Sequence, residues 1–208
     1  MERFIVVDYH AGNLTSVLNA FEHLGISVKA SSDPSEISSA DRLVFPGVGA
    51  ARSAMETLER TGIGSAIVRV IERKRPVLGI CIGCQIVLKS SEENGGVECL
   101  GLVEGRAVRF REEPGIKIPE MGWNQVEFLK PHPIFEGVPS GSDFYFVHSF
   151  HPDAILPENA LAKTTFGSQT FVSAVFRENL VATQFHLEKS GDIGLRVLRN
   201  FSAWSGLC

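Results

Sequence analysis

Residues 76–85 read Pro-Val-Leu-Gly-Ile-Cys-Ile-Gly-Cys-Gln, an apolar run that ends in a Gly-x-Cys-x-Gly motif. The short run after a proline predicts a strand buried on both faces, and the apolar residues after Gln85 predict a helix. Glycines on both sides of Cys81 allow a sharp turn and a close approach of neighbouring backbone. Hydrolases hold a nucleophilic serine in the same strand–turn–helix arrangement. Cys81 is therefore a candidate nucleophile.

Two other interpretations of this cysteine stay open. Cys81 and Cys84 have the spacing of a redox Cys-x-x-Cys pair, and Cys81 could also be a buried residue of a tight turn without chemistry. As a nucleophile, Cys81 would stand at a helix N-terminus, where the dipole and unpaired N–H groups favour the thiolate. The N–H of Gly83 would then point towards an oxyanion formed at the attacked carbon.

The segments around this motif predict the fold class. Strand and helix signals alternate before it, whereas strands separated by Gly, Pro and Asn dominate after it. The strands are expected at 4–7, 26–30, 42–45, 76–80, 106–111, 125–129, 143–147, 161–165, 171–176 and 180–185, and the helices around 14–24, 51–58, 63–71, 85–88 and 193–201. This order predicts an α/β fold, a single domain over residues 1–208 with a mixed, largely parallel central sheet flanked by helices.

Composition excludes several classes of function. The chain has 208 residues, and 20 basic against 24 acidic side chains give a net charge of −4, which argues against binding to nucleic acid. Its longest apolar stretch, 77–88, is shorter than the roughly 18 residues of a membrane span. Four unevenly spaced cysteines without a secretory signal indicate reduced thiols in a cytoplasmic protein. We see no metal-ligand spacing and no phosphate-loop signature, so neither a metal nor a cofactor is expected.

A nucleophilic cysteine needs a base, and His186 is the strongest candidate among six histidines. It ends the apolar run 180–185, and Glu188 follows two residues later. Residues two apart at the end of a strand share a side, so Glu188 could orient the imidazole as the third member of a triad does. The alternative, a solvated His and Glu in a surface loop, stays open on these residues alone.

Six segments in order carry a resemblance to a known family. They are Asp-Tyr-His-Ala-Gly-Asn at 8–13, Pro-Gly-Val-Gly at 46–49, the cysteine motif at 79–85, Met-Gly-Trp-Asn at 121–124, Tyr-Phe-Val-His-Ser at 145–149 and Phe-His-Leu-Glu-Lys-Ser at 185–190. Over essentially its whole length the chain resembles the class I (triad) glutamine amidotransferases. Within that family it looks most like the glutaminase subunits of imidazole glycerol phosphate synthase, which serve histidine biosynthesis.

The resemblance implies roles for individual residues. Cys81 would attack the side-chain amide of glutamine and form a glutamyl thioester, with His186 moving the protons and Glu188 steering His186. The oxyanion would be held by the N–H groups of Gly83 and of the loop at Val48 and Gly49, where a peptide could first have to reorient. The residues implied in holding glutamine are Gly49, Gln85, Ser149 and Phe150.

The resemblance also implies a partner. A glutaminase of this size has little chain left to bind an ammonia acceptor, and free ammonia would be lost to water. The implied partner is a (β/α)₈-barrel cyclase subunit that receives ammonia through a closed path and releases imidazole glycerol phosphate and an aminoimidazole carboxamide ribotide. Asn13, Trp123 and Lys189 match positions that face this partner.

Three residues depart from the family's pattern. Leu187 stands where proline is usual, Glu120 where histidine is common and Cys84 where methionine is common. These departures keep open a paralogous glutaminase that serves another synthase, such as one for surface sugars. Cys84 also suggests a disulfide with Cys81 under oxidation, and a thiol redox protein or a catalytically idle docking subunit remain competing hypotheses.

Overall fold

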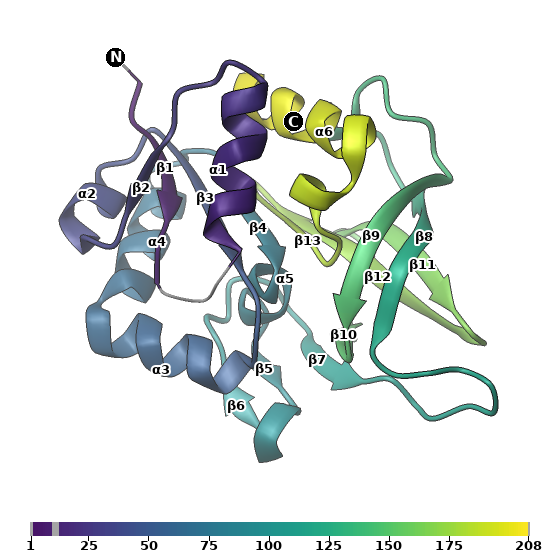
Figure 1. The fold of residues 1–208 in the computed structure, drawn as a ribbon. Coiled ribbons are helices and arrows are strands. Elements are labelled where there is room, and N and C mark those ends of the chain that lie inside the picture. Colours follow the sequence, from purple (N-terminus) through teal and green to yellow (C-terminus); the bar gives the residue numbers. More distant parts are fainter. Residues whose placement is uncertain (1, 10–12, 208) are drawn as a thin grey trace.

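The chain is built around one large sheet, shown by a computed structural model that describes residues 2–9 and 13–207. Residues 10–12 of the Asp8–Asn13 segment lie outside the described residues. Nine strands lie in the order β2-β1-β3-β4-β13-β12-β11-β8-β9 (Figure 1). The pairs among β2, β1, β3, β4 and β13 are parallel, and the pairs from β13 to β9 are antiparallel. The predicted mixed sheet of an α/β fold is therefore confirmed.

The first half supplies the parallel strands and the helices between them. Its elements are β1 (Phe4–Val7), α1 (Leu14–His23), β2 (Lys29–Ser31), α2 (Pro34–Ser38), β3 (Arg42–Gly47), α3 (Ala51–Thr61), α4 (Ile63–Glu72), β4 (Val77–Cys81) and α5 (Ile82–Ile86). The helix after β4 starts at Ile82, three residues earlier than expected, and is one of the shortest. Its last residues are fully buried, and Val87 then binds the incoming backbone of Leu102 and Val103.

The second half completes the sheet and adds a smaller one. Its elements are β5 (Ser90–Ser91), η1 (Glu93–Gly95), β6 (Val97–Glu98), β7 (Arg106–Arg109), β8 (Glu120–Phe128), η2 (Pro133–Phe135), β9 (Ser142–His148), β10 (Phe150–Asp153), β11 (Ala160–Phe166), β12 (Gln169–Arg177), β13 (Leu180–Thr183), η3 (Leu187–Lys189) and α6 (Gly191–Ala203). The small sheet has the order β10-β7-β5-β6, and the sequence did not predict it beyond β7. The strands β5 and β6 have two residues each and carry too little alternation to be recognised, and β10 contains Pro152, which argues against a strand.

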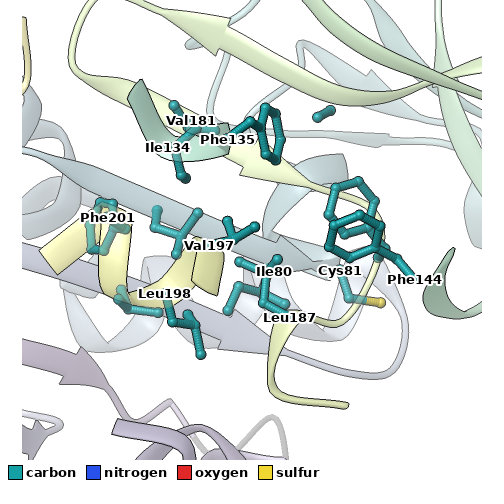
Figure 2. Packing of buried hydrophobic residues seen from close by; sticks show 14 of the residues in the cluster. Ile80, Cys81, Ile134, Phe135, Phe144, Val181, Leu187, Val197, Leu198 and Phe201 are labelled. Atoms are coloured by element: carbon teal, nitrogen blue, oxygen red, sulfur yellow. The ribbon is translucent and has the colours of Figure 1, made fainter. Parts of the chain in front are cut away.

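The two faces of the large sheet bury separate apolar clusters. In β1, Phe4 and Val6 pack with α1 and α6 on one face, whereas Ile5 and Val7 pack with α2, α3 and α4 on the other. This explains the unbroken apolar run, since a strand covered on both faces has no solvent-exposed side. Figure 2 shows the first cluster, in which Cys81 lies at the end of β4 near Leu187.

The segment after His186 is held against α6 by a close backbone contact. Gly194 lies in the first turns of α6, and a Cβ added there would stand 1.9 Å from the carbonyl oxygen of Leu187. Only a residue without a side chain lets the helix approach η3 this closely. Gly194 therefore fixes where the turn that carries Glu188 lies.

We expect Gly194→Ala to lower the free energy of unfolding by about 1–3 kcal/mol, because the new methyl group must push α6 away from η3. The matched control is Gly64→Ala in α4, where the nearest atoms to the added Cβ are 3.5 Å away. There, alanine should keep the stability or raise it by up to about 1 kcal/mol through helix propensity. Urea unfolding of both variants measures the difference, and equal effects would contradict the proposed contact.

Candidate active site

The turn at Cys81 is strained and held by close packing. Cys81 has φ 56° and ψ −102°, a conformation that side chains rarely adopt. A Cβ on Gly83 would lie 2.7 Å from the carbonyl oxygen of Phe45, and one on Gly79 would lie 3.0 Å from both Ala182 and Phe45. Both glycines of the motif are thus required by neighbouring atoms, as expected for a turn that presents its central residue.

His186 and Glu188 meet beside this turn. The backbone N–H of His186 donates to the backbone carbonyl of Tyr145 at 2.8 Å, which joins the segment after β13 to β9. The Nδ1 atom of His186 lies 2.6 Å from Glu188 Oε1, and both side chains are buried. The expected pairing is present, but its cause differs from the strand alternation that suggested it. The chain turns through η3 after His186, and this turn brings Glu188 back to the ring.

Asn13 joins this pair from the N-terminus of α1. Its side-chain amide donates to Glu188 Oε1 and lies 3.4 Å from His186 Nδ1. Asn13 itself has a left-handed backbone and makes no side-chain cap of α1. The sequence had placed Asn13 on the partner-facing surface, so its contact with the carboxylate is an addition from the structure.

The His186 imidazole is held in its charged form. Burial lowers its pKa, but the interactions with Cys81 and Glu188 beside it more than offset burial and raise the pKa to about 10. The Nε2 atom of His186 is buried and has no aligned hydrogen bond within residues 2–9 and 13–207. The arrangement therefore places a cysteine beside a protonated imidazole that is backed by a carboxylate, and Nε2 has no other hydrogen-bond partner among the described residues.

A cavity of about 460 Å³ opens in front of Cys81. It is lined by Val48, Gly49, Ala50, Cys81, Ile82, Gln85, Glu93, Pro119, Val147, His148, Ser149 and Phe150. The structure thus brings together the predicted nucleophile, the loop after β3 and the residues expected to hold glutamine. Gly83, His186 and Glu188 are not among the residues that line it.

The carbonyl of Phe150 at the cavity wall is held from two sides. It accepts a hydrogen bond from Gln85 Nε2 at 2.9 Å and lies 2.8 Å from Nδ1 of His148. Behind His148, a carboxylate oxygen of Glu120 lies 3.0 Å from Nε2 without hydrogen-bond alignment, and both side chains are buried. Asn124 donates to the other oxygen of Glu120 at 2.7 Å. The departure at Glu120 thus places a carboxyl group beside a cavity-lining histidine.

Sequence reasoning missed Glu93 and Gln184. Glu93 lines the cavity, and its Oε2 atom accepts from the Ala51 N–H at the start of α3 at 2.6 Å. Gln184 is fully buried, and its side-chain amide lies 3.8 Å from Cys81 Sγ. Glu93 follows another glutamate in a polar turn without periodicity, so no signal marked it. Gln184 lies two residues before His186, and that spacing could have suggested it.

The two cysteines of the motif point to different surroundings. Cys81 belongs to the cluster with α6, whereas Cys84 is fully buried in the cluster on the other face of the sheet. The Cys84 thiol donates to the Ala182 carbonyl at 3.5 Å, and burial, followed by the nearby Cys81, raises its pKa. Both thiols are free. Since a redox pair needs a reactive thiolate that can reach its partner, this arrangement favours the nucleophile.

An exposed apolar patch lies on β8 next to the site. Met121 and Trp123 are 66% and 58% exposed. The Trp123 ring lies edge-on to Tyr145 at 6.2 Å, and Lys189 Nζ lies 5.9 Å from the centre of the same ring. Two of the predicted partner-facing residues therefore flank one tyrosine. Within the described residues there is no cluster of three metal-ligating side chains and no helix long and apolar enough to span a membrane.

Comparison with known proteins identifies the family of the chain. The family model Glutamine amidotransferase class-I matches residues 5–203. An imidazole glycerol phosphate synthase subunit HisH from Syntrophotalea carbinolica is 46% identical, with 95% of this chain and 98% of the relative covered. The subunit HisH from Acinetobacter baylyi is 44% identical, with 99% and 100% covered.

Solved structures share the fold at lower identity. A putative GMP synthase protein from Thermoplasma acidophilum superimposes with a TM-score of 0.74 at 23% identity, covering 98% of this chain and 93% of that one. The PurLQS structure from Thermotoga maritima gives 0.72 at 19% identity, covering 97% and 98%. The chain therefore belongs to the class-I glutamine amidotransferase family, and relatives that match nearly its whole length are subunits of imidazole glycerol phosphate synthase.

Proposed function

We propose that this chain hydrolyses glutamine to glutamate and ammonia as the glutaminase subunit of an imidazole glycerol phosphate synthase. One observation carries the proposal: a strained cysteine that lines a cavity of about 460 Å³ is also in contact with a buried His–Glu pair. Nucleophile, base and orienting carboxylate in this order are the parts of covalent amide hydrolysis.

The geometry supports a two-step reaction. The Cys81 thiolate attacks the amide carbon, and the carbonyl oxygen takes the negative charge. The N–H of Gly83 and the Val48–Gly49 loop are the proposed donors to this oxygen. The imidazolium of His186 then protonates the leaving nitrogen, the C–N bond breaks and ammonia departs. Neutral His186 next takes a proton from water, which attacks the thioester and releases glutamate with restoration of the thiolate.

The cavity walls support glutamine as the substrate. Gln85, Gly49 and the backbone at Ser149 and Phe150 surround the space next to Cys81. A free amino acid also carries an ammonium group, which needs a negative partner. We assign that role to Glu93, whose carboxylate lines the same cavity and is fixed by the Ala51 N–H.

A partner follows from the product and the surface. Ammonia released to water would be protonated, so the chain would dock on a synthase that consumes it. The exposed Met121 and Trp123 with the neighbouring Lys189 support a docking face beside the site. We propose a (β/α)₈-barrel cyclase as the partner, in a cytoplasmic heterodimer of histidine biosynthesis. The names of the relatives, imidazole glycerol phosphate synthase subunits, support this choice over a surface-sugar synthase.

Glutamate release from glutamine tests the reaction and the partner together. The chain should release glutamate faster with a candidate cyclase and its nucleotide ligand than alone, and Cys81→Ala should abolish release, because the thioester cannot form. Cys99→Ala, a free thiol outside the cavity, is the matched control and should keep the activity. Release that the cyclase leaves unchanged would point to another synthase, and release that survives in Cys81→Ala would refute the mechanism.

The pH dependence tests the charged His186. Because its pKa is raised to about 10, its proton is lost only as the pH rises through that region, so kcat/KM should fall on the alkaline side near pH 10. Glu188 contributes to the raised pKa, so Glu188→Gln should move this alkaline limb to lower pH and reduce kcat by about 10²–10⁴-fold. Glu127→Gln, in an exposed pair with Lys163, is the control. An unmoved limb in Glu188→Gln would contradict the assignment.

The proposed role of Glu93 in binding the ammonium group of glutamine can be tested separately from the triad. Glu93→Gln removes the charge that would pair with the ammonium of glutamine, so KM should rise about tenfold while kcat changes little. Glu92→Gln is the control, since Glu92 is exposed and does not line the cavity. Steady-state kinetics of both variants would measure the split. An unchanged KM in Glu93→Gln would remove Glu93 from the substrate site.

A further inference from the structure

Gln184 is a buried polar side chain that the mechanism above does not use. It lies between the end of β13 and His186, and its backbone N–H donates to the Ser173 carbonyl at 2.8 Å. Its side chain has no exposed surface, and its Nε2 atom lies 3.8 Å from Cys81 Sγ, within hydrogen-bonding range for sulfur. A fully buried amide at this distance can act directly on the sulfur of the nucleophile.

The orientation of this amide follows from its neighbours. The Phe150 carbonyl can only accept, so Gln85 must present its NH₂ group there, at 2.9 Å. The same NH₂ group lies 3.2 Å from the other end of the Gln184 side chain, which must then be the accepting Oε1 atom. The NH₂ group of Gln184 is left to face the sulfur of Cys81.

We propose that Gln184 is a positioning residue that donates a hydrogen bond to the Cys81 sulfur and stabilises its thiolate form. The proposal rests on Cys81 being the nucleophile of the proposed function. His186 and Gln184 come from one segment two residues apart, and both act on the same sulfur. His186 supplies the opposite charge and the proton that is transferred, whereas Gln184 supplies a hydrogen-bond donor that keeps its proton throughout the reaction.

A fixed donor matters at two moments of the reaction. The sulfur is negative before it attacks the amide, and it becomes negative again when water displaces it from the thioester. A hydrogen bond to an anion is stronger than one to a neutral group, so the Gln184 donor favours both states over the neutral thioester sulfur. Through Gln85, the same amide is linked to the Phe150 carbonyl, so sulfur and cavity wall are held by one pair of side chains.

Alkylation of Cys81 by iodoacetamide tests the proposal without glutamine or partner. The rate is followed against pH by mass spectrometry that resolves Cys81 from Cys84. Gln184→Met keeps the length of the side chain but removes the donor, so the midpoint of the rate profile should move about one unit to higher pH. At a pH below both midpoints, a shift of one unit makes alkylation about tenfold slower. Gln169→Met is the matched control. Gln169 is also buried, and its side-chain amide donates hydrogen bonds to the Arg111 carbonyl and to Glu113, not to Cys81.

A second variant keeps the test decisive if the methionine chain folds poorly. Gln184→Glu retains the oxygen that accepts from Gln85 but puts a carboxylate near the sulfur, so its midpoint should move further upward. A midpoint unchanged in folded Gln184→Met or Gln184→Glu, or shifted equally by Gln169→Met, would overturn the proposal. A shifted midpoint in a chain that never releases glutamate would support Gln184's hydrogen bond and reject the proposed function, so the two can fail separately.

Discussion

The left-handed turn at Cys81 is the constraint on which the site depends. A cysteine at φ 56° persists only when the surroundings enforce it, and here the backbone of Phe45 and the side chain of Ala182 leave no room at Gly83 and Gly79. Those neighbours belong to β3 and β13, the strands on either side of β4. The same adjacency brings the loop after β3 and the segment after β13 to the carboxyl end of β4, where open α/β sheets bind their ligands.

Local sequence patterns predicted much of this arrangement. The apolar run into Gly-x-Cys-x-Gly predicted the turn, and His186 with Glu188 was recognisable because the two lie close along the chain. Contacts between distant segments were not predictable, since nothing in Asn13 or Glu93 marks a partner more than forty residues away. Even the correct pairing of His186 with Glu188 arises from a turn of η3 and not from strand alternation. Hydrophobic periodicity predicts which sides of helices and strands are buried. The residues of the site lie where strands end, and periodicity gives no information there.

Polar groups around the nucleophile are buried in pairs. The Phe150 carbonyl joins the amide of Gln85 to the imidazole of His148, and Glu120 stands behind that imidazole. Buried polar groups are costly unless they are partnered, so such a network has few alternative arrangements. This explains how a cavity wall assembled from the ends of α5, β8, β9 and β10 can keep one geometry.

The two tryptophans of the chain lie in opposite surroundings. Trp204 is 4% exposed, and its indole donates to the Leu207 carbonyl, whereas Trp123 stands largely in water on β8. Indole emission shifts to shorter wavelength when water is withdrawn from the ring. The emission of Trp204 is set by the protein interior and does not respond to contacts at β8. A partner that covers β8 withdraws water from Trp123 and therefore shifts the emission of Trp123. The chain thus contains an intrinsic optical reporter of occupancy at this face, with its own internal reference in the core.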